Sequence, residues 1–219
     1  MDPIWEKIHS SREWGKYPAD DLIRTVMRTY KKSNTAELDV LEVGFGGGAN
    51  LAFFVNEGFN VYGIDGAPSA VKNTLERLQG LVKPDQVFDL VSQNFADLPW
   101  PDHSFNIVVD HWAIYANSTS DIKAAFAECH RVLKPGGHLY SRSWAQGCTG
   151  FDTGTVMEPG TSNNPTKGPC KDMGTSHFFN QGEINEILAG YADRQIRLST
   201  ISDQSTGEQV IEWLCWARK

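Results

Sequence analysis

Four glycines within five positions mark the part of this sequence that is best suited to hold a nucleotide-like ligand. Residues 40–43 form a short apolar run, residues 44–48 read Gly-Phe-Gly-Gly-Gly, and an apolar helical pattern resumes at residue 51. Strand, glycine turn and helix in this order are typical of a nucleotide-binding loop. Glycine allows positive φ and a close approach of the backbone to a ligand, and the helix N-terminus behind it offers unpaired N–H groups.

Two carboxylates accompany this loop. Glu42 lies in the expected strand two residues before Gly44, and Asp65 ends the next expected strand, 21 residues after Gly44. That spacing suits a carboxylate that accepts hydrogen bonds from a ribose diol. Gly44, Gly46 and Ala49 also satisfy the dinucleotide pattern G-x-G-x-x-G/A. A carboxylate at position 42, however, faces a cation more favourably than a pyrophosphate. The pair therefore favours a ligand that carries both a ribose and an ammonium group.

Strands and helices alternate along most of the chain. We expect strands at residues 38–43, 61–65, 87–91, 105–110 and 138–144, and helices that begin at Pro18, Leu51, Pro68, Ile122 and Gln181. This alternation predicts an α/β fold with an open, mostly parallel sheet and helices on both faces. Residues 196–201 and 209–217 alternate in polarity around a turn at 203–207, which predicts a C-terminal antiparallel hairpin and brings the sheet to seven strands.

Two segments stand outside this alternation. Residues 1–17 combine aromatic and charged side chains, and nine of the 33 residues in 145–177 are Gly or Pro. A long loop after the fifth strand lies at the carboxyl edge of the sheet, where ligands bind in such folds. We expect one domain over residues 1–219, made of an N-terminal flap and helix (1–37), a cofactor-binding core (38–144), an inserted substrate lid (145–177) and a last helix with the hairpin (178–219).

Four segments resemble motifs of the class I S-adenosylmethionine-dependent methyltransferases, in the order and spacing of that family. Glu42-x-Gly44-x-Gly46-x-Gly48 resembles their E/D-x-G-x-G-x-G motif, and Asp65 stands at their acidic second-strand position. Residues 94–106 resemble their D-A-x-x-L-P-F-x-D-x-S-F-D segment, and residues 131–137 read R-V-L-K-P-G-G, like the turn before their fifth strand. The resemblance covers residues 38–144 and, more loosely, the last helix and hairpin. It implies a Rossmann-like fold, S-adenosylmethionine as cofactor and S-adenosylhomocysteine as product.

The resemblance also implies which residues contact the cofactor. Glu42 would pair with the amino group of its methionine moiety, and Asp65 would accept hydrogen bonds from the ribose. The other implied contacts are Gly44, Gly46 and Gly48 along the methionine moiety, Gly66, Ala67, Asn94 and Phe95 around the adenine, and Asp110 with His111 facing the methyl donor. Asn94 replaces the usual aspartate, and its amide oxygen can still accept a hydrogen bond from the adenine amino group.

Methyl transfer is an in-line displacement that needs alignment and a deprotonated nucleophile, so a hydroxyl acceptor benefits from a general base. The candidate bases are His111, Tyr115, His177 and, from the flap, His9. A structural role is the alternative for each histidine. Candidate substrate contacts are Trp14 and Tyr17 in the flap and Arg142 in the fifth strand, where it can reach an acidic group.

Composition and charge exclude several other classes. The 219 residues carry a net charge of -7, which argues against a surface that binds nucleic-acid phosphates. The fourth strand ends in Asp-His-Trp-Ala and lacks the D/N-P-P-Y/F pattern of enzymes that methylate amino groups of DNA bases or glutamine. No apolar run reaches the roughly 18 residues of a membrane span, and no signal peptide is visible, so we expect a cytoplasmic protein without membrane contact.

The four cysteines form no C-x-x-C pair, which predicts free thiols in a reducing compartment. Cys148, Cys170 and His177 fit no metal-ligand spacing, so we expect no metal site.

We therefore predict an S-adenosylmethionine-dependent methyltransferase that acts on a small molecule, as a monomer or homodimer. O-methylation with a general base is the first expectation, and N-methylation is the second. Two alternatives come from other classes. An NAD-dependent oxidoreductase would be stabilised by NAD(H) and not by S-adenosylhomocysteine, whereas a non-catalytic protein would bind S-adenosylmethionine without turnover.

Overall fold

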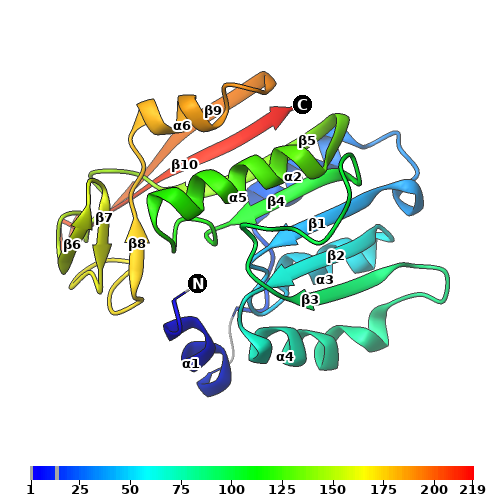
Figure 1. The fold of residues 1–219 in the computed structure, drawn as a ribbon, viewed down its shortest axis with the longest axis horizontal. Coiled ribbons are helices and arrows are strands. Elements are labelled where there is room, and N and C mark those ends of the chain that lie inside the picture. The colour runs from blue at the N-terminus through cyan, green and yellow to red at the C-terminus, as the bar shows by residue number, and fades with distance from the viewer. Residues whose placement is uncertain (1, 13–14) are drawn as a thin grey trace.

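A seven-stranded sheet with the order β3-β2-β1-β4-β5-β10-β9 runs through the molecule (Figure 1). The computed structural model describes residues 2–12 and 15–219. The strands of this sheet are β1 (Asp39–Val43), β2 (Asn60–Asp65), β3 (Phe88–Ser92), β4 (Phe105–His111), β5 (Leu133–Trp144), β9 (Ala192–Ser202) and β10 (Gln209–Arg218). β1 to β5 pair in parallel, and β10 runs antiparallel to both β5 and β9. The predicted mostly parallel sheet with an antiparallel hairpin is confirmed.

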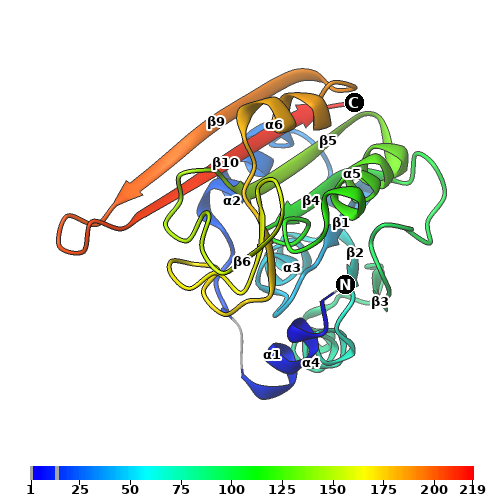
Figure 2. The same cartoon turned by 60° about the vertical axis from the view of Figure 1, so that its left-hand side comes forward.

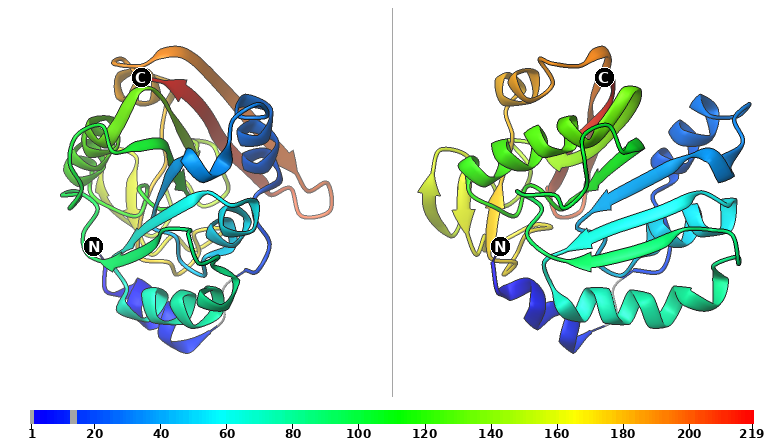
Figure 3. Two further views of the ribbon diagram at one scale, coloured as in Figure 1. Left: turned by 90° about the vertical axis from the view of Figure 1, so that its right-hand side faces the viewer. Right: turned by 45° about the vertical axis from the view of Figure 1, so that its right-hand side comes forward.

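Helices cover both faces of this sheet (Figure 3). α2 (Asp20–Thr29), α3 (Ala49–Glu57) and α4 (Pro68–Leu78) pack on one face, and α5 (Thr119–Val132) and α6 (Gln181–Ile187) pack on the other. Alternate residues of β1 supply both cores, because successive side chains of a strand point to opposite faces. Val40 joins the α2–α4 core, and Leu41 joins the α5–α6 core. Glu42 therefore points to the α3 face.

Most element boundaries lie within a few residues of the predicted ones. α2 begins at Asp20, two residues after Pro18, and α5 begins at Thr119 because the Ser118 side chain accepts a hydrogen bond from the Asp121 N–H. β5 differs most, since it begins at Leu133 and so includes the expected turn at residues 134–137. Hydrogen bonds between the backbones of Gly136, Gly137 and Lys219 bring this stretch into the sheet.

Residues 145–177, which we expected to form an irregular lid, carry a second, three-stranded antiparallel sheet. Its strands are β6 (Thr155–Glu158), β7 (Thr161–Asn163) and β8 (Thr175–His177). Cys148 and Cys170 from this segment are buried in the main core. All four cysteines are free thiols, as predicted.

The segment before α2 contains a helix, α1 (Ile4–Ser11), which lies beside α4 (Figure 2). The Glu6 carboxylate accepts hydrogen bonds from the Ser69 N–H at 3.1 Å and from the Ser69 hydroxyl at 2.6 Å. Asp2 accepts hydrogen bonds from the N–H and the hydroxyl of Thr175 in β8. One carboxylate thus joins the start of the chain to the inserted sheet. Two short 3-10 helices, η1 (Thr35–Glu37) and η2 (Gln79–Leu81), complete the fold.

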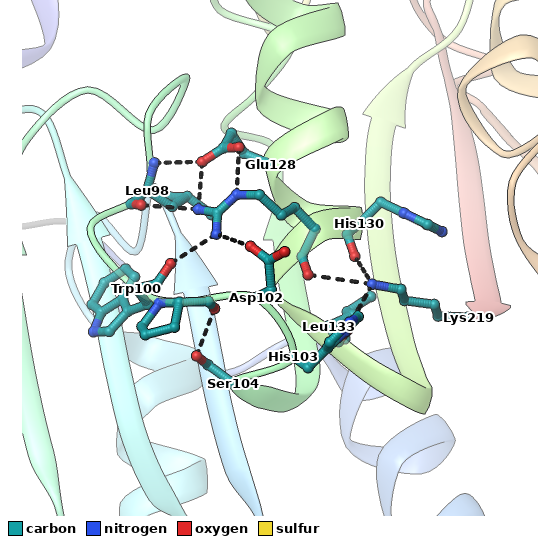
Figure 4. A network of polar contacts seen from close by, with 11 residues as sticks. Leu98, Trp100, Asp102, His103, Ser104, Glu128, His130, Leu133 and Lys219 are labelled. Carbon is teal, nitrogen blue, oxygen red and sulfur yellow. Dashed lines mark hydrogen bonds and ion pairs between the residues drawn. The ribbon is translucent and has the colours of Figure 1, made fainter.

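Arg131, in the segment that reads R-V-L-K-P-G-G, holds the loop between β3 and β4. Figure 4 labels its partners Leu98, Trp100 and Asp102 in that loop. The Arg131 guanidinium donates to both oxygens of Glu128, at 2.7 and 2.8 Å, and to the carbonyls of Leu98 and Trp100, at 3.1 and 3.0 Å. It also donates to the Asp102 carboxylate. These contacts fix the loop that carries Phe95.

Candidate active site

A cavity of about 470 Å³ opens at the carboxyl ends of β1, β2, β4 and β5. Ligands bind at this edge of open α/β sheets because the loops that leave the strands converge there. Most of the described residues that line the cavity are apolar or aromatic. Its walls come from the glycine loop, the turn after β4, the end of β5, α1 and the inserted segment.

The glycine loop forms the floor of this cavity. Gly44, Gly46 and Gly48 have φ values of 64°, 51° and 68°, a region that other L-residues rarely adopt. A Cβ on Gly44 would lie 2.2 Å from the Ala113 Cβ, and one on Gly48 would lie 2.4 Å from the Thr74 Cγ2. Gly44 and Gly46 line the cavity, whereas Gly48 faces α4. The glycines are thus required by backbone conformation and by close packing.

Glu42 is buried at the end of β1 with one carboxylate oxygen unsatisfied. Its Oε1 accepts a hydrogen bond from the Asn50 side chain at 2.8 Å, while its Oε2 has no hydrogen-bond partner among the described residues. Burial raises the pKa of the Glu42 carboxyl to about 8, and the nearby Asp65 and Asp110 add to that rise. An ammonium group of a ligand would supply both the missing hydrogen bond and the missing charge.

Asp65 is held in position at the end of β2 by two backbone donors. Its Oδ2 accepts from the Gly46 N–H and its Oδ1 from the Ala67 N–H, both at 2.9 Å. Burial raises its pKa, and these two hydrogen bonds oppose that rise. Each carboxylate oxygen can accept a second hydrogen bond, so a ligand diol fits beside the loop. His9 of α1 lies close enough to Asp65 for their charges to interact, and it lines the same part of the cavity.

The opposite end of the cavity is aromatic and contains His111, the last residue of β4. Its Nε2 has no hydrogen-bond partner within residues 2–12 and 15–219. Burial, with a smaller effect of Arg142, lowers the pKa of His111 to about 4, so this imidazole is neutral at pH 7. Tyr115 lines the cavity too, but burial holds the pKa of its hydroxyl well above the usual value. His111 is therefore the better proton acceptor of the two.

Several residues that were expected to contact the ligand are not among the described residues that line the cavity. Gly66, Ala67 and Asn94 do not line it, and the Asn94 Oδ1 accepts a hydrogen bond from the Ala96 N–H. Asp110 is fully buried below the cavity. It accepts hydrogen bonds from the N–H groups of Ala113 and Ile114 and from the Ser141 hydroxyl, and so shapes the turn after β4.

Arg142 and His177, which were also expected to act in the site, do not line this cavity and have partners elsewhere. The Arg142 guanidinium pairs with Asp21 at 3.1 Å and with the buried Glu212 at 2.6 Å, so its charge is matched within the protein. His177 is buried in β8, where its Nδ1 lies 2.7 Å from the Thr161 hydroxyl and its Nε2 lies 3.4 Å from Glu183. It lines a different cavity, between α5 and α6.

Tyr17, from the flap, is exposed and lines the mouth of the cavity, and Phe95 is buried along its wall. Trp14, which was expected to contact the substrate, lies outside the described residues. The lining residues that were not predicted from the sequence include Trp112, Asn117, Trp144, Pro169 and Met173. The two tryptophans follow or end strands β4 and β5, and this position was the signal that could have identified them.

Two further observations bear on the class of protein. The described residues contain no group of three or more His, Cys, Asp or Glu side chains placed to hold a metal ion. None of the helices in the described ranges has the length and apolarity to cross a lipid bilayer.

Residues 41–141 match the family model for a methyltransferase domain. A demethylmenaquinone methyltransferase of Tropheryma whipplei (strain Twist) is 33% identical over 108 residues, which cover 48% of this chain and 41% of that protein. A probable S-adenosylmethionine-dependent methyltransferase of Mycolicibacterium smegmatis is 32% identical over 154 residues, or 68% of this chain and 49% of that protein. The chain spans about half the length of the curated relatives that it matches.

Solved structures share the fold at low sequence identity. An S-adenosylmethionine-dependent methyltransferase from Methanosarcina mazei has a TM-score of 0.70 at 20% identity, over 89% of this chain and 96% of that one. A Burkholderia thailandensis 1,6-didemethyltoxoflavin-N1-methyltransferase, solved with 1,6-didemethyltoxoflavin and S-adenosylhomocysteine bound, has a TM-score of 0.59 at 15% identity, over 94% and 92%. The family match, the relatives and the shared fold together identify a methyltransferase domain of the class I S-adenosylmethionine-dependent type at residues 41–141.

Proposed function

We propose that this chain transfers the methyl group of S-adenosylmethionine to a hydroxyl oxygen of a small molecule, with His111 as general base. One observation carries the proposal. Two buried atoms, the carboxylate oxygen Glu42 Oε2 and the imidazole nitrogen His111 Nε2, lack partners among the described residues, and both residues line one cavity. They come from the adjacent strands β1 and β4, in which Val43 pairs with Asp110. The first atom suits an ammonium group, and the second suits a proton.

The cofactor end of the cavity fits S-adenosylmethionine residue by residue. Glu42 would hold the ammonium of the methionine moiety, Gly44 and Gly46 would let the backbone approach it, and Asp65 would hold the ribose hydroxyls. Phe95 would pack beside the adenine. The bound cofactor supplies a methyl group on a positively charged sulfur, and its departure leaves a neutral thioether.

The remaining chemistry takes place at His111. A lone pair of the acceptor oxygen would form the new O–C bond in place of the C–S bond, and the electron pair of the C–S bond would stay on sulfur. The hydroxyl proton passes to the Nε2 of His111. Because the low pKa keeps this imidazole unprotonated at pH 7, it is ready to accept that proton. The aromatic walls exclude water and align the two reactants.

The inserted segment and the N-terminal segment would enclose the acceptor. Pro169 and Met173 from the first and Tyr17 from the second line the cavity. Residues 145–177 would thus act as the substrate lid expected from the sequence, although part of the segment is folded into the core. Asp2 links the two segments through Thr175.

The fold alone does not fix the reaction, because a structure of the [4+2]-cyclase SpnF has a TM-score of 0.62 with this chain at 17% identity. The test is a methyl-transfer screen with labelled S-adenosylmethionine against pooled metabolites, followed by identification of the labelled atom. Label on a hydroxyl oxygen supports the proposal. Label on nitrogen would favour the second expectation, N-methylation, and saturable cofactor binding without transfer to any pool would count against catalysis.

Replacing the base provides a residue-level test of this proposal. We expect His111→Gln to lower kcat by about 10²- to 10⁴-fold on the identified acceptor, since this is the usual contribution of a positioned base. The affinity for S-adenosylhomocysteine should change less than about twofold by calorimetry. His103→Gln is a matched control, because the His103 ring contacts the Leu133 carbonyl at the start of β5. A His111→Gln enzyme with a normal kcat would refute the role of the base.

A further inference from the structure

Half of the unsatisfied buried polar atoms in the described residues belong to side chains of one cavity's lining residues. Eight buried side-chain nitrogen and oxygen atoms lack a hydrogen-bond partner there, and four of them belong to residues that line the cavity. One is Glu42 Oε2, at the cofactor end. The other three are nitrogens at the aromatic end, namely His111 Nε2, Trp112 Nε1 and Trp144 Nε1, and the last lies close enough to the Tyr115 hydroxyl to oppose the rise in that group's pKa. A buried N–H donor without a partner is costly, so the two indole nitrogens require an acceptor that the ligand brings, whereas His111 Nε2 can accept a proton.

The two indoles form a rigid pair. Their rings stack in parallel, with centroids 4.9 Å apart and an interplanar angle of 10°. Trp112 adopts a positive φ of 54°, a strained conformation for a tryptophan that the turn after β4 holds in place. The His111 ring lies 4.3 Å from the Trp112 ring. Two N–H donors and one proton acceptor are therefore presented by neighbouring rings.

This end of the cavity does not favour a cationic acceptor. The Arg142 guanidinium lies 4.4 Å from the centroid of the Trp112 ring, so a cation already occupies the attractive face of that indole. Among the described lining residues, the carboxylates are Glu42 and Asp65, both at the cofactor end. The carboxylate oxygens of the buried Asp110 already accept hydrogen bonds from the turn after β4 and from the Ser141 hydroxyl. An ammonium group would find no counter-ion here.

We propose that the methyl acceptor is a hydroxylated aromatic ring, and that the indole N–H groups of Trp112 and Trp144 donate hydrogen bonds to its oxygen. The inference rests on the proposed function and specifies its substrate class. A flat ring suits the aromatic walls, and an oxygen satisfies the orphaned donors while its proton is within reach of His111. The same donors would stabilise the negative charge that grows on the oxygen as its proton leaves.

The test compares two probes that share a naphthalene ring and differ in the polar group it carries. Both are measured on the complex of the protein with S-adenosylhomocysteine. Calorimetry measures the Kd of 2-naphthol and of 2-(aminomethyl)naphthalene, which is an ammonium at pH 7. We expect 2-naphthol to bind at least about tenfold more tightly. Trp112→Phe and Trp144→Phe, which keep a ring but remove the N–H, should each weaken 2-naphthol about three- to tenfold, the value of one net hydrogen bond. Trp100→Phe, which alters a ring packed on Tyr62 and Phe105, is the control.

The outcomes separate this inference from the proposed function. Equal or tighter binding of the ammonium probe, binding of neither probe, or unchanged 2-naphthol affinity in both tryptophan variants would overturn the substrate class, while S-adenosylhomocysteine binding and methyl transfer would stand. Failure of the wild-type protein to bind S-adenosylhomocysteine would overturn the proposed function and this inference together. The affinity of each variant for S-adenosylhomocysteine, expected within about twofold of the wild type, reports that it is folded. The comparison of probes on the wild type needs no variant.

Discussion

Binding of S-adenosylhomocysteine at pH 7 should release most of one proton, and Glu42→Gln should abolish that release. The pKa of Glu42 is about 8 in the unliganded protein, so its carboxyl is mainly protonated at pH 7. Pairing with the ligand ammonium stabilises the carboxylate, which then gives up its proton. Calorimetry in buffers of different ionisation enthalpy measures this stoichiometry. The variant should also bind the ligand at least about tenfold more weakly, because the buried ammonium loses its counter-charge.

The pH dependence has a defined sign. Below pH 8 the binding reaction must remove a proton from Glu42, so the affinity should rise with pH by up to about tenfold per unit between pH 6 and pH 8. It should level off above that range. Glu42→Gln should give a flat profile over the same range. A wild-type affinity that is independent of pH, or that falls across this window, would contradict the assigned ammonium contact.

The raised pKa of Glu42 also predicts that the unliganded protein becomes less stable as the pH rises, whereas its affinity for the ligand increases. The folded-state pKa of Glu42 lies above its ordinary value of 4.5, so its ionisation disfavours the folded state. The neutral Glu42 carboxyl therefore contributes to the free energy of unfolding. This contribution is fully present below about pH 4.5 and is lost progressively as the pH rises through about 8. The Tm of Glu42→Gln should therefore exceed that of the wild type at pH 8 and approach it at pH 5. The variant would be more stable and yet bind its cofactor less well.

Asp65→Ala should weaken the affinity for S-adenosylhomocysteine by about 100-fold or more. Hydrogen bonds from ligand hydroxyls to a carboxylate contribute about 1.5–3 kcal/mol each, and two would be lost. The variant also removes the acceptor that orients the Gly46 and Ala67 N–H groups, so the glycine loop loses its alignment. Calorimetry at fixed pH measures the change.

Asp89→Ala is the matched control for this prediction, because Asp89 is an exposed aspartate on the neighbouring strand β3. Its affinity for S-adenosylhomocysteine should equal that of the wild type. If Asp65→Ala also bound with unchanged affinity, the ribose contact would have to be assigned to another residue.

The alternating strands and helices of this fold were predictable from the sequence because they depend on local patterns. The apolar strands, the helix-starting Pro68 and the glycines after β1 each leave a signature in neighbouring residues. The strand order and the antiparallel hairpin also agree with the expected fold. The inserted sheet was not predicted, since β7 and β8 are three residues long and Gly and Pro separate them.

The aromatic end of the cavity was harder to predict than the cofactor end. Arg142 looked available for a substrate, but its partners Asp21 and Glu212 lie 121 and 70 residues away in the chain. His177 likewise finds Thr161 and Glu183 only after the inserted sheet forms. Such pairings depend on long-range contacts, whereas the positions of Glu42 and Asp65 follow from the strands that carry them. Trp112 and Trp144 were not predicted as site residues, since an isolated tryptophan is more often a packing residue.

The position of β10 between β5 and β9 has a consequence for the order of folding. Translation delivers β9 before β10, and in the described structure β9 pairs with β10 alone. Neither strand of the hairpin can join the sheet until residues 209–218 are available. The five parallel strands that position the cofactor are complete by residue 144. Completion of the aromatic wall, where the Ala145 N–H donates to the Ile211 carbonyl, must wait for the hairpin. The strands that carry the cofactor loop are therefore synthesised well before the strand that anchors the hairpin to β5.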